Sequence, residues 1–184
     1  MKAILSVLLL SLCVTASSAQ PKDFVTLAPG PSGYAWWLRA EFHPVDVMVR
    51  DIPVGQLRAT WCKATEFRKD LFPPDLATDF GQTGGLSFAA DGFFDGSKVK
   101  QTALVGAYEA CDGKRGSFLL ILARPQDKAP VVRFVHEMPI PFAMLSVTNA
   151  TIVVFHCMEC DHVTEFKWDK SKKRFAQLRA RRAQ

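Results

Sequence analysis

From Leu86 onward, the chain consists of short apolar segments separated by clusters of turn-forming residues. Two such clusters are Asp112-Gly113-Lys114 and Asp169-Lys170-Ser171. Short segments at this spacing are typical of antiparallel β-sheets. We therefore expect strands at Leu86–Ala90, Gln101–Ala110, Gly116–Arg124, Pro130–Glu137, Phe142–Val147, Thr151–His156, His162–Trp168 and Lys173–Leu178. The segment Phe118–Leu122 is apolar at every position, which predicts a central strand buried on both faces.

The N-terminal part shows two further patterns. From Tyr34 to Phe42 every second residue is apolar, with Trp37, Arg39 and Glu41 on the opposite face, which predicts a strand with one buried face. Between Gly55 and Leu71 the apolar residues recur at helical spacing, so a helix is expected there. The predicted fold class is mainly β (α+β). It is an antiparallel meander, a sandwich or blade-like sheets of about eight to nine strands, with one helix in the N-terminal half.

The first residues have the features of a secretory signal. Lys2 precedes a short apolar stretch, and Ser17-Ser18-Ala19 supplies small residues for cleavage before Gln20. The stretch is shorter than the ~20 residues that span a bilayer, and we expect no transmembrane segment in the mature chain. The predicted organisation is a signal peptide at 1–19, an irregular lead-in at 20–33, one β-rich domain at 34–178 and a basic tail at 179–184. The expected location is secreted or periplasmic, with the bacterial periplasm favoured.

Four cysteines follow Cys13 of this signal: Cys62, Cys111, Cys157 and Cys160. An even number in an exported chain favours structural disulfides. We expect Cys157 to pair with Cys160 across a turn, and Cys62 with Cys111 by default. Two alternatives stay open for the C-x-x-C segment, namely a zinc site completed by His156 and His162, and a redox-active dithiol.

The loop Ala90–Ser97 is rich in Asp and Gly and precedes an apolar strand that contains Ala103–Gly106. This pattern resembles a single degenerate repeat of the FG-GAP/VCBS type, whose loop binds calcium in some β-propellers. The resemblance implies calcium ligands at Asp91, Asp95 and Ser97. The chain departs from the pattern at Phe93, where another oxygen ligand is expected, and at Val99, where the closing acid is expected. A structural turn without an ion is the alternative.

The same loop is also the predicted binding loop, made of Asp91, Phe93, Phe94 and Asp95. Two adjacent phenylalanines there either form an exposed recognition tip or anchor the loop in the core.

The formal net charge of +5 is unevenly distributed. From Lys170 to the end there are seven basic residues and no acidic ones, so the rest of the chain is net negative. A basic tail suits anionic polymers of the envelope, whereas export argues against nucleic acid.

The sequence contains no G-x-S-x-G, H-E-x-x-H or phosphate-binding glycine motif. We therefore expect an exported non-enzymatic binding protein of the cell envelope, such as an inhibitor or immunity-type protein against an envelope-targeting enzyme. A protein partner is favoured, and the acidic body would suit a cationic one. A carbohydrate- or peptidoglycan-binding module is the first alternative. It would use Tyr34, Trp36, Trp37, Trp61 and Trp168, residues that core packing also explains. An enzyme assembled from His136, Asp91 and His162 is the second.

Overall fold

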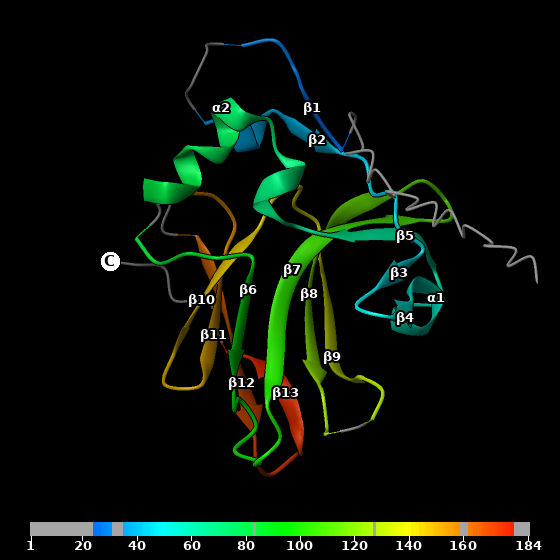
Figure 1. Ribbon diagram of the computed structural model, residues 1–184, viewed down its shortest axis with the longest axis vertical. Coiled ribbons are helices and arrows are strands. Elements are labelled where there is room, and N and C mark those ends of the chain that lie inside the picture. The colour runs from blue at the N-terminus through cyan, green and yellow to red at the C-terminus, as the bar shows by residue number, and fades with distance from the viewer. Residues whose placement is uncertain (1–23, 31–34, 83, 127, 159–161, 179–184) are drawn as a thin grey trace, which may run out of the picture.

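The computed structural model describes residues 24–30, 35–82, 84–126, 128–158 and 162–178. Within these ranges the chain is mostly β, with thirteen strands in four antiparallel sheets (Figure 1), which confirms the predicted class. The predicted signal peptide and the tail at 179–184 lie outside the described residues. No helix in the described ranges is long and apolar enough to cross a bilayer.

The larger sheet is organised around the long strand β7. It contains β5 (Trp61–Glu66), β6 (Ala89–Gly92), β7 (Gln101–Ala110), β8 (Arg115–Ala123) and β9 (Val131–Met138). Strands β5 and β6 share one edge of β7: β6 pairs with its first residues and β5 with its last. Strand β8 pairs with the other edge along its whole length, and β9 follows β8.

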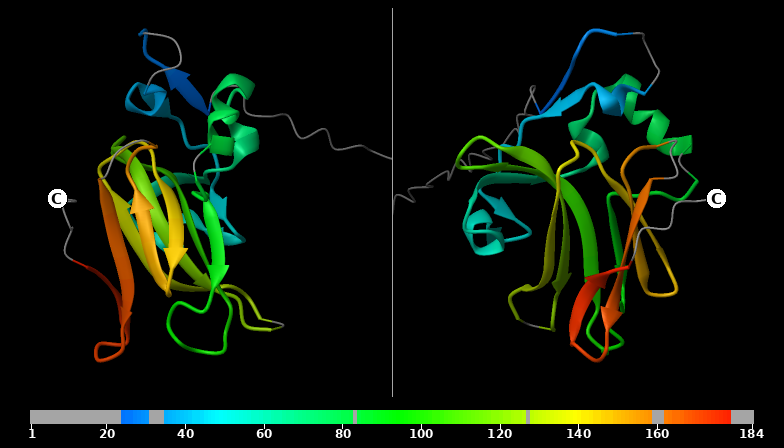
Figure 2. Two further views of the ribbon diagram at one scale, coloured as in Figure 1. Left: turned by 90° about the vertical axis from the view of Figure 1, so that its left-hand side faces the viewer. Right: turned by 180° about the vertical axis from the view of Figure 1, so that it is seen from behind.

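The second sheet is a meander of the last four strands. These are β10 (Met144–Thr148), β11 (Thr151–Phe155), β12 (Val163–Asp169) and β13 (Arg174–Gln177). Asn149 and Ala150, both at positive φ, form the two-residue turn between β10 and β11, as expected of a tight hairpin. Backbone hydrogen bonds between Ser87 and Leu145 join the two sheets at one edge. The sheets pack face to face as a sandwich (Figure 2).

Strand β8 separates two hydrophobic cores. Leu119 and Ile121 point into the core between the sheets, whereas Phe118, Leu120 and Leu122 point into a second core. The second core is covered by β3 (Met48–Val49), β4 (Ile52–Pro53) and α1 (Val54–Leu57). The prediction that this strand is buried on both faces is confirmed.

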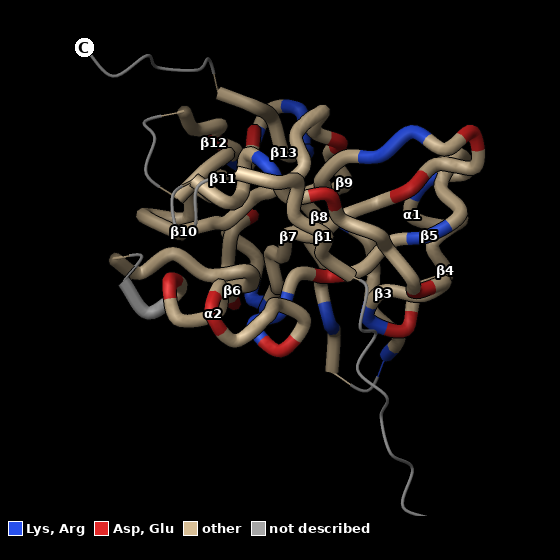
Figure 3. The backbone as a smooth tube through the Cα atoms, turned by 90° about the horizontal axis from the view of Figure 1, so that it is seen from above, with Lys and Arg blue, Asp and Glu red and all other residues tan. Residues whose placement is uncertain are grey.

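An aromatic cluster closes one end of the sandwich, beneath β1 (Val25–Leu27), β2 (Ala40–Phe42) and α2 (Pro74–Ala77). Phe142 lies within it, with ring centroids 5.2 Å from Trp36, 5.7 Å from Phe67 and 6.1 Å from Phe42. Seen from this end, Lys and Arg residues are interspersed with Asp and Glu (Figure 3).

The predicted strand from Tyr34 to Phe42 is wrong over its first half. Trp36–Leu38 forms a 3₁₀-helix, and the strand begins only at Ala40. The tight turn places the neighbouring side chains of Trp36 and Trp37 in the core together, while Leu38 is 73% exposed. The alternation of residue types in the sequence therefore did not reflect the two faces of a strand.

The predicted helix from Gly55 to Leu71 is also wrong. The segment contains α1, then β5, then a 3₁₀-helix at Lys69–Leu71; a further 3₁₀-helix follows α2 at Asp79–Gln82. A β-bulge interrupts the pairing of β5 with β7 between Trp61 and Lys63. The extra residue turns Trp61 and Ala64 toward the same core, although they are three positions apart. The bulge thus imitates helical spacing.

Candidate functional site

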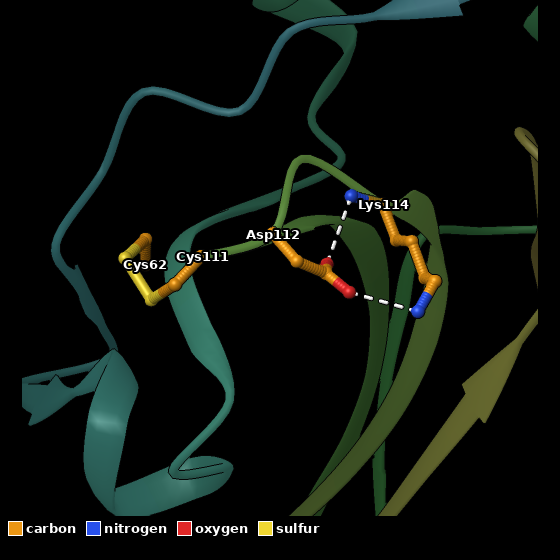
Figure 4. The surroundings of a disulfide bond; sticks show 4 residues. All are labelled: Cys62, Cys111, Asp112 and Lys114. Atoms are coloured by element: carbon orange, nitrogen blue, oxygen red, sulfur yellow. Dashed lines mark hydrogen bonds and ion pairs between the residues drawn. A yellow bond between two sulfur atoms is a disulfide. The ribbon is translucent and has the colours of Figure 1, made fainter.

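The disulfide between Cys62 and Cys111 is confirmed (Figure 4). It joins the bulge of β5 to the turn between β7 and β8, so it links two strand ends rather than a helix and a sheet. Their Cα atoms are 4.9 Å apart.

Cys157 is also disulfide-bonded. Cys160, its predicted partner, lies outside the described residues, so that pairing stays a prediction. A cysteine in a disulfide has no thiolate to offer zinc. Within the described ranges, no group of three or more His, Cys, Asp or Glu side chains is placed to hold a metal ion.

The turn that carries Cys111 is held by local hydrogen bonds. The Asp112 carboxylate accepts from the Lys114 backbone N–H at 3.1 Å and from its ammonium at 2.8 Å. Gly113 adopts a φ of 85°, which a residue with a side chain rarely does. The Cys111 N–H donates to the Thr60 carbonyl at 2.9 Å. Local bonds and the disulfide together fix the position of this turn.

A surface pocket of about 380 Å³ lies beside the disulfide. Its lining residues are Thr60, Trp61, Tyr108, Ala110, Cys111, Asp112, Lys114 and Glu137. The Trp61 and Tyr108 rings stack at 4.6 Å, and the indole N–H of Trp61 donates to the Glu137 carboxylate at 3.0 Å. The pocket therefore combines aromatic rings with a carboxylate held in one orientation.

The electrostatics of the pocket follow from these groups. Burial raises the pKa of Tyr108, and the charges of Glu137 and Asp112 raise it further, so the phenol stays neutral at physiological pH. Lys114 also lines the pocket, but its ammonium is bound by Asp112. The Glu137 carboxylate also lies 3.5 Å from the Arg58 guanidinium, and both this contact and the Trp61 hydrogen bond use Oε1. A basic group of a ligand would therefore bind at Oε2 or compete with Arg58.

The predicted binding and calcium residues lie on β6 and on the loop that follows it. The Asp91 carboxylate accepts from the Thr102 hydroxyl at 2.7 Å and lies 2.8 Å from the Lys100 ammonium, whose hydrogen bond lowers the pKa of Asp91. Asp95 is 3.0 Å from the Arg133 guanidinium and accepts from the Ser97 N–H at 2.9 Å.

Burial works against the charged form of Asp95, yet the hydrogen bonds from Ser97 and the charge of Arg133 outweigh it and lower the pKa. The two acidic residues predicted as calcium ligands thus already face basic side chains, with Lys100 at Asp91 and Arg133 at Asp95, while the Ser97 hydroxyl bonds to the backbone of Val99. A calcium ion would have to compete with these cations, and the calcium site and the repeat resemblance stay predictions.

The two phenylalanines of the loop have different roles. Phe94 is 3% exposed and belongs to the core between the sheets, and its N–H donates to the Gln101 side chain at 2.9 Å. Phe93 is 56% exposed. The loop is therefore anchored by one ring and presents the other.

The tryptophans belong mainly to the core. Trp36, Trp37 and Trp61 are buried, Trp168 is half-buried, and Tyr34 lies outside the described residues. Three of the five aromatic residues proposed for sugar binding are thus not available as a surface platform.

The histidines are dispersed among different environments. His136 contacts Phe166 on the inner side of β9, while Glu137 points to Trp61 on the other side, as strand alternation predicts. His156 and His162 have ring centroids 4.3 Å apart. Asp91 lies on β6 among basic partners. The structure shows no contact that joins His136, His162 and Asp91 among the described residues.

His156 should make folding sensitive to acid. Burial lowers its pKa to about 4, helped by the charges of His162 and His136; its Nε2 bonds to the Thr164 hydroxyl, and its buried Nδ1 has no partner among the described residues. Because the folded state resists protonation and the unfolded state does not, stability should fall between about pH 6.5 and pH 4. Solvent screening of this half-buried ring limits the loss to about 1–2 kcal/mol.

Urea unfolding at pH 7 and pH 4.5 measures this loss. His156→Gln should reduce it, whereas His43→Gln, at a histidine that contacts Thr26 and Arg115 instead, should leave it unchanged. An equal loss in wild type and His156→Gln would contradict the assignment.

Most of the pocket could not be found from the sequence. The sequence predicted a turn at Asp112-Gly113-Lys114 and a disulfide at the neighbouring Cys111. Trp61 and Glu137, however, are 76 positions apart, and only the pairing of β5, β7, β8 and β9 brings them together.

Comparison with protein-family models, curated proteins and solved structures finds no match to this chain.

Proposed function

We propose that this chain is an exported, non-enzymatic binding protein of the cell envelope, and that the pocket beside Cys62–Cys111 receives a basic side chain of a protein partner. The observation that supports this is the meeting of the Trp61–Tyr108 stack and the Glu137 carboxylate in one pocket. The carboxylate would bind the head group of Lys or Arg through a charged hydrogen bond, and the parts of the two rings that reach the pocket would pack against the methylene chain of that side chain.

The rigidity of the site supports a role in binding. The disulfide and the bonds of Asp112 hold the turn before any partner arrives, so little conformational entropy is lost on association. An oxidising compartment is where such a disulfide persists. In its concrete form, the protein is an inhibitor or immunity-type protein that blocks an enzyme attacking the envelope, and a basic side chain of that enzyme would meet the Glu137 carboxylate.

Site-specific photo-crosslinking in intact cells tests this proposal. A photoreactive residue at exposed Thr60, which lines the pocket, should give a discrete adduct with one partner. The same residue at exposed Lys69, away from the pocket, should not. Glu137→Gln keeps an acceptor for Trp61 but removes the charge, and should weaken binding of the purified partner about tenfold or more.

Two results would contradict the proposal: no adduct from the Thr60 position, or partner affinity that is unchanged in Glu137→Gln. The activity of the captured partner, measured with and without this protein, then tests the inhibitory role. If the partner is an enzyme that keeps full activity when saturated with this protein, the binding role stands but the inhibitory role is excluded.

A further inference from the structure

The loops at one end of the sandwich carry a concentrated positive charge. The connections β6–β7, β8–β9 and β12–β13 lie together at the end opposite α2 and β1 in every view (Figures 1 and 2). Residues 93–100, 124–130 and 169–174 contain eight Lys and Arg residues against three Asp. We call these three segments the basic loop end.

Contacts between the segments make them one surface. Arg133 of β9 lies 3.0 Å from Asp95 of the β6–β7 loop, and its guanidinium stacks 5.5 Å from the ring centroid of Trp168 on β12. The Arg124 N–H donates to the Lys100 carbonyl at 3.3 Å. Arg133 thus holds together parts of the chain that are far apart in sequence.

The two acids of this end that the structure describes already face cations, and basic residues outnumber acidic ones in these segments, so the net charge of this end is positive. Asp95 pairs with Arg133, and Asp169 lies 3.7 Å from Lys172. Lys98 and Lys170 are exposed, and neither forms an ion pair with a described residue. An anionic partner would therefore find free ammonium groups on two different loops.

The same end also exposes apolar side chains. Phe93 is 56% exposed, Val131 47% and Val99 36%. Val99 and Val131 line a pocket of about 200 Å³ together with Asp95 and Arg133. Lysines around an exposed aromatic ring favour binding to an anionic lipid interface, because apolar insertion and attraction to headgroups act together. A soluble polyanion without rings, such as polyphosphate, gains nothing from the ring.

We propose that the basic loop end docks on an anionic lipid surface, with Phe93 entering the interface and Lys98 and Lys170 facing the headgroups. This inference is independent of the pocket proposed above. Strand β7 runs from the basic loop end to the turn of Cys111, a distance of roughly 30 Å at the usual rise per residue. A protein docked in this way would hold its disulfide-bound pocket away from the lipid, open to a partner.

Vesicle co-sedimentation tests the proposal with protein purified from its host in its naturally processed form. Vesicles of phosphatidylglycerol and phosphatidylcholine should bind it, those of phosphatidylcholine alone should not, and 0.5 M NaCl should weaken binding strongly. Lys98→Glu/Lys170→Glu should weaken binding at least about twentyfold. The matched control Lys63→Glu/Lys69→Glu changes charge equally, at exposed positions outside the basic loop end, and should stay within about twofold.

Insertion of Phe93 has its own matched pair. Phe93→Ser should weaken vesicle binding about tenfold, whereas Leu38→Ser, which removes a 73% exposed leucine outside the basic loop end, should have little effect. Full binding by Lys98→Glu/Lys170→Glu would overturn the proposal. So would binding to soluble polyphosphate without binding to vesicles, or vesicle binding that is indifferent to Phe93→Ser. Glu137→Gln should bind vesicles normally, which separates this result from the pocket.

Discussion

Cys62→Ser/Cys111→Ser is expected to lower the free energy of unfolding by about 4 kcal/mol. The two cysteines are 49 positions apart, and closing a loop of that length removes much conformational entropy from the unfolded chain. Both side chains are exposed, so the serines should pack without strain. Guanidinium unfolding of wild type and variant, under oxidising conditions, measures the difference.

Cys157→Ser/Cys160→Ser is the control. If those two cysteines pair as predicted, the loop they close is far shorter and the loss should be clearly smaller. A loss below about 1 kcal/mol for Cys62→Ser/Cys111→Ser would contradict the chain-entropy account. If both bridges form, wild type treated with a reductant should be less stable than either variant under oxidising conditions, because it loses both bridges.

Sequence reasoning succeeded where short-range signals decide the structure. The strands after Leu86 are bounded by Asp, Gly and Pro residues, and β7 has the predicted limits Gln101–Ala110. The uninterrupted run Phe118–Leu122 identified the strand that lies between two cores. Such signals need only neighbouring residues, so a single sequence contains them.

It failed where a local irregularity changed the meaning of a spacing. The bulge at Trp61 converts a strand into an apparent helix, and the 3₁₀-turn at Trp36 hides a core contact inside an apparent strand. A bulge is stabilised by its partner strand, here the end of β7, so nothing in the segment itself marks it.

The sequence also misplaced the positive charge. The turn Asp169-Lys170-Ser171 and the strand Lys173–Leu178 were predicted, and Lys170 and Arg174 do belong to the β12–β13 hairpin, but their charge was counted as part of a basic tail. This hairpin lies at the same end of the sandwich as the β6–β7 and β8–β9 connections, whose residues include Lys98 and Arg124 (Figure 1). Charge counted along the chain cannot show this, because the antiparallel sheets decide which connections share an end.

Phe142→Ala is expected to lower the free energy of unfolding by about 4 kcal/mol. The side chain is 1% exposed and contacts rings of residues that lie outside both large sheets, among them Phe42 and Phe72. Truncation would leave a cavity where these rings meet, and rigid aromatic neighbours cannot collapse to fill it. Thermal and urea unfolding measure the loss.

Phe142→Leu and Phe93→Ala make the result specific. Leucine retains most of the buried volume, so we expect a loss of about 1–2 kcal/mol. Phe93 is 56% exposed, and its truncation should cost less than about 0.5 kcal/mol. Equal losses for Phe142→Ala and Phe93→Ala would contradict the aromatic cluster as the contact that closes the sandwich. We expect the loss in the free energy of unfolding to be largest for Phe142→Ala and smallest for Phe93→Ala. Phe142 would then stabilise the fold, whereas Phe93 would be available for binding.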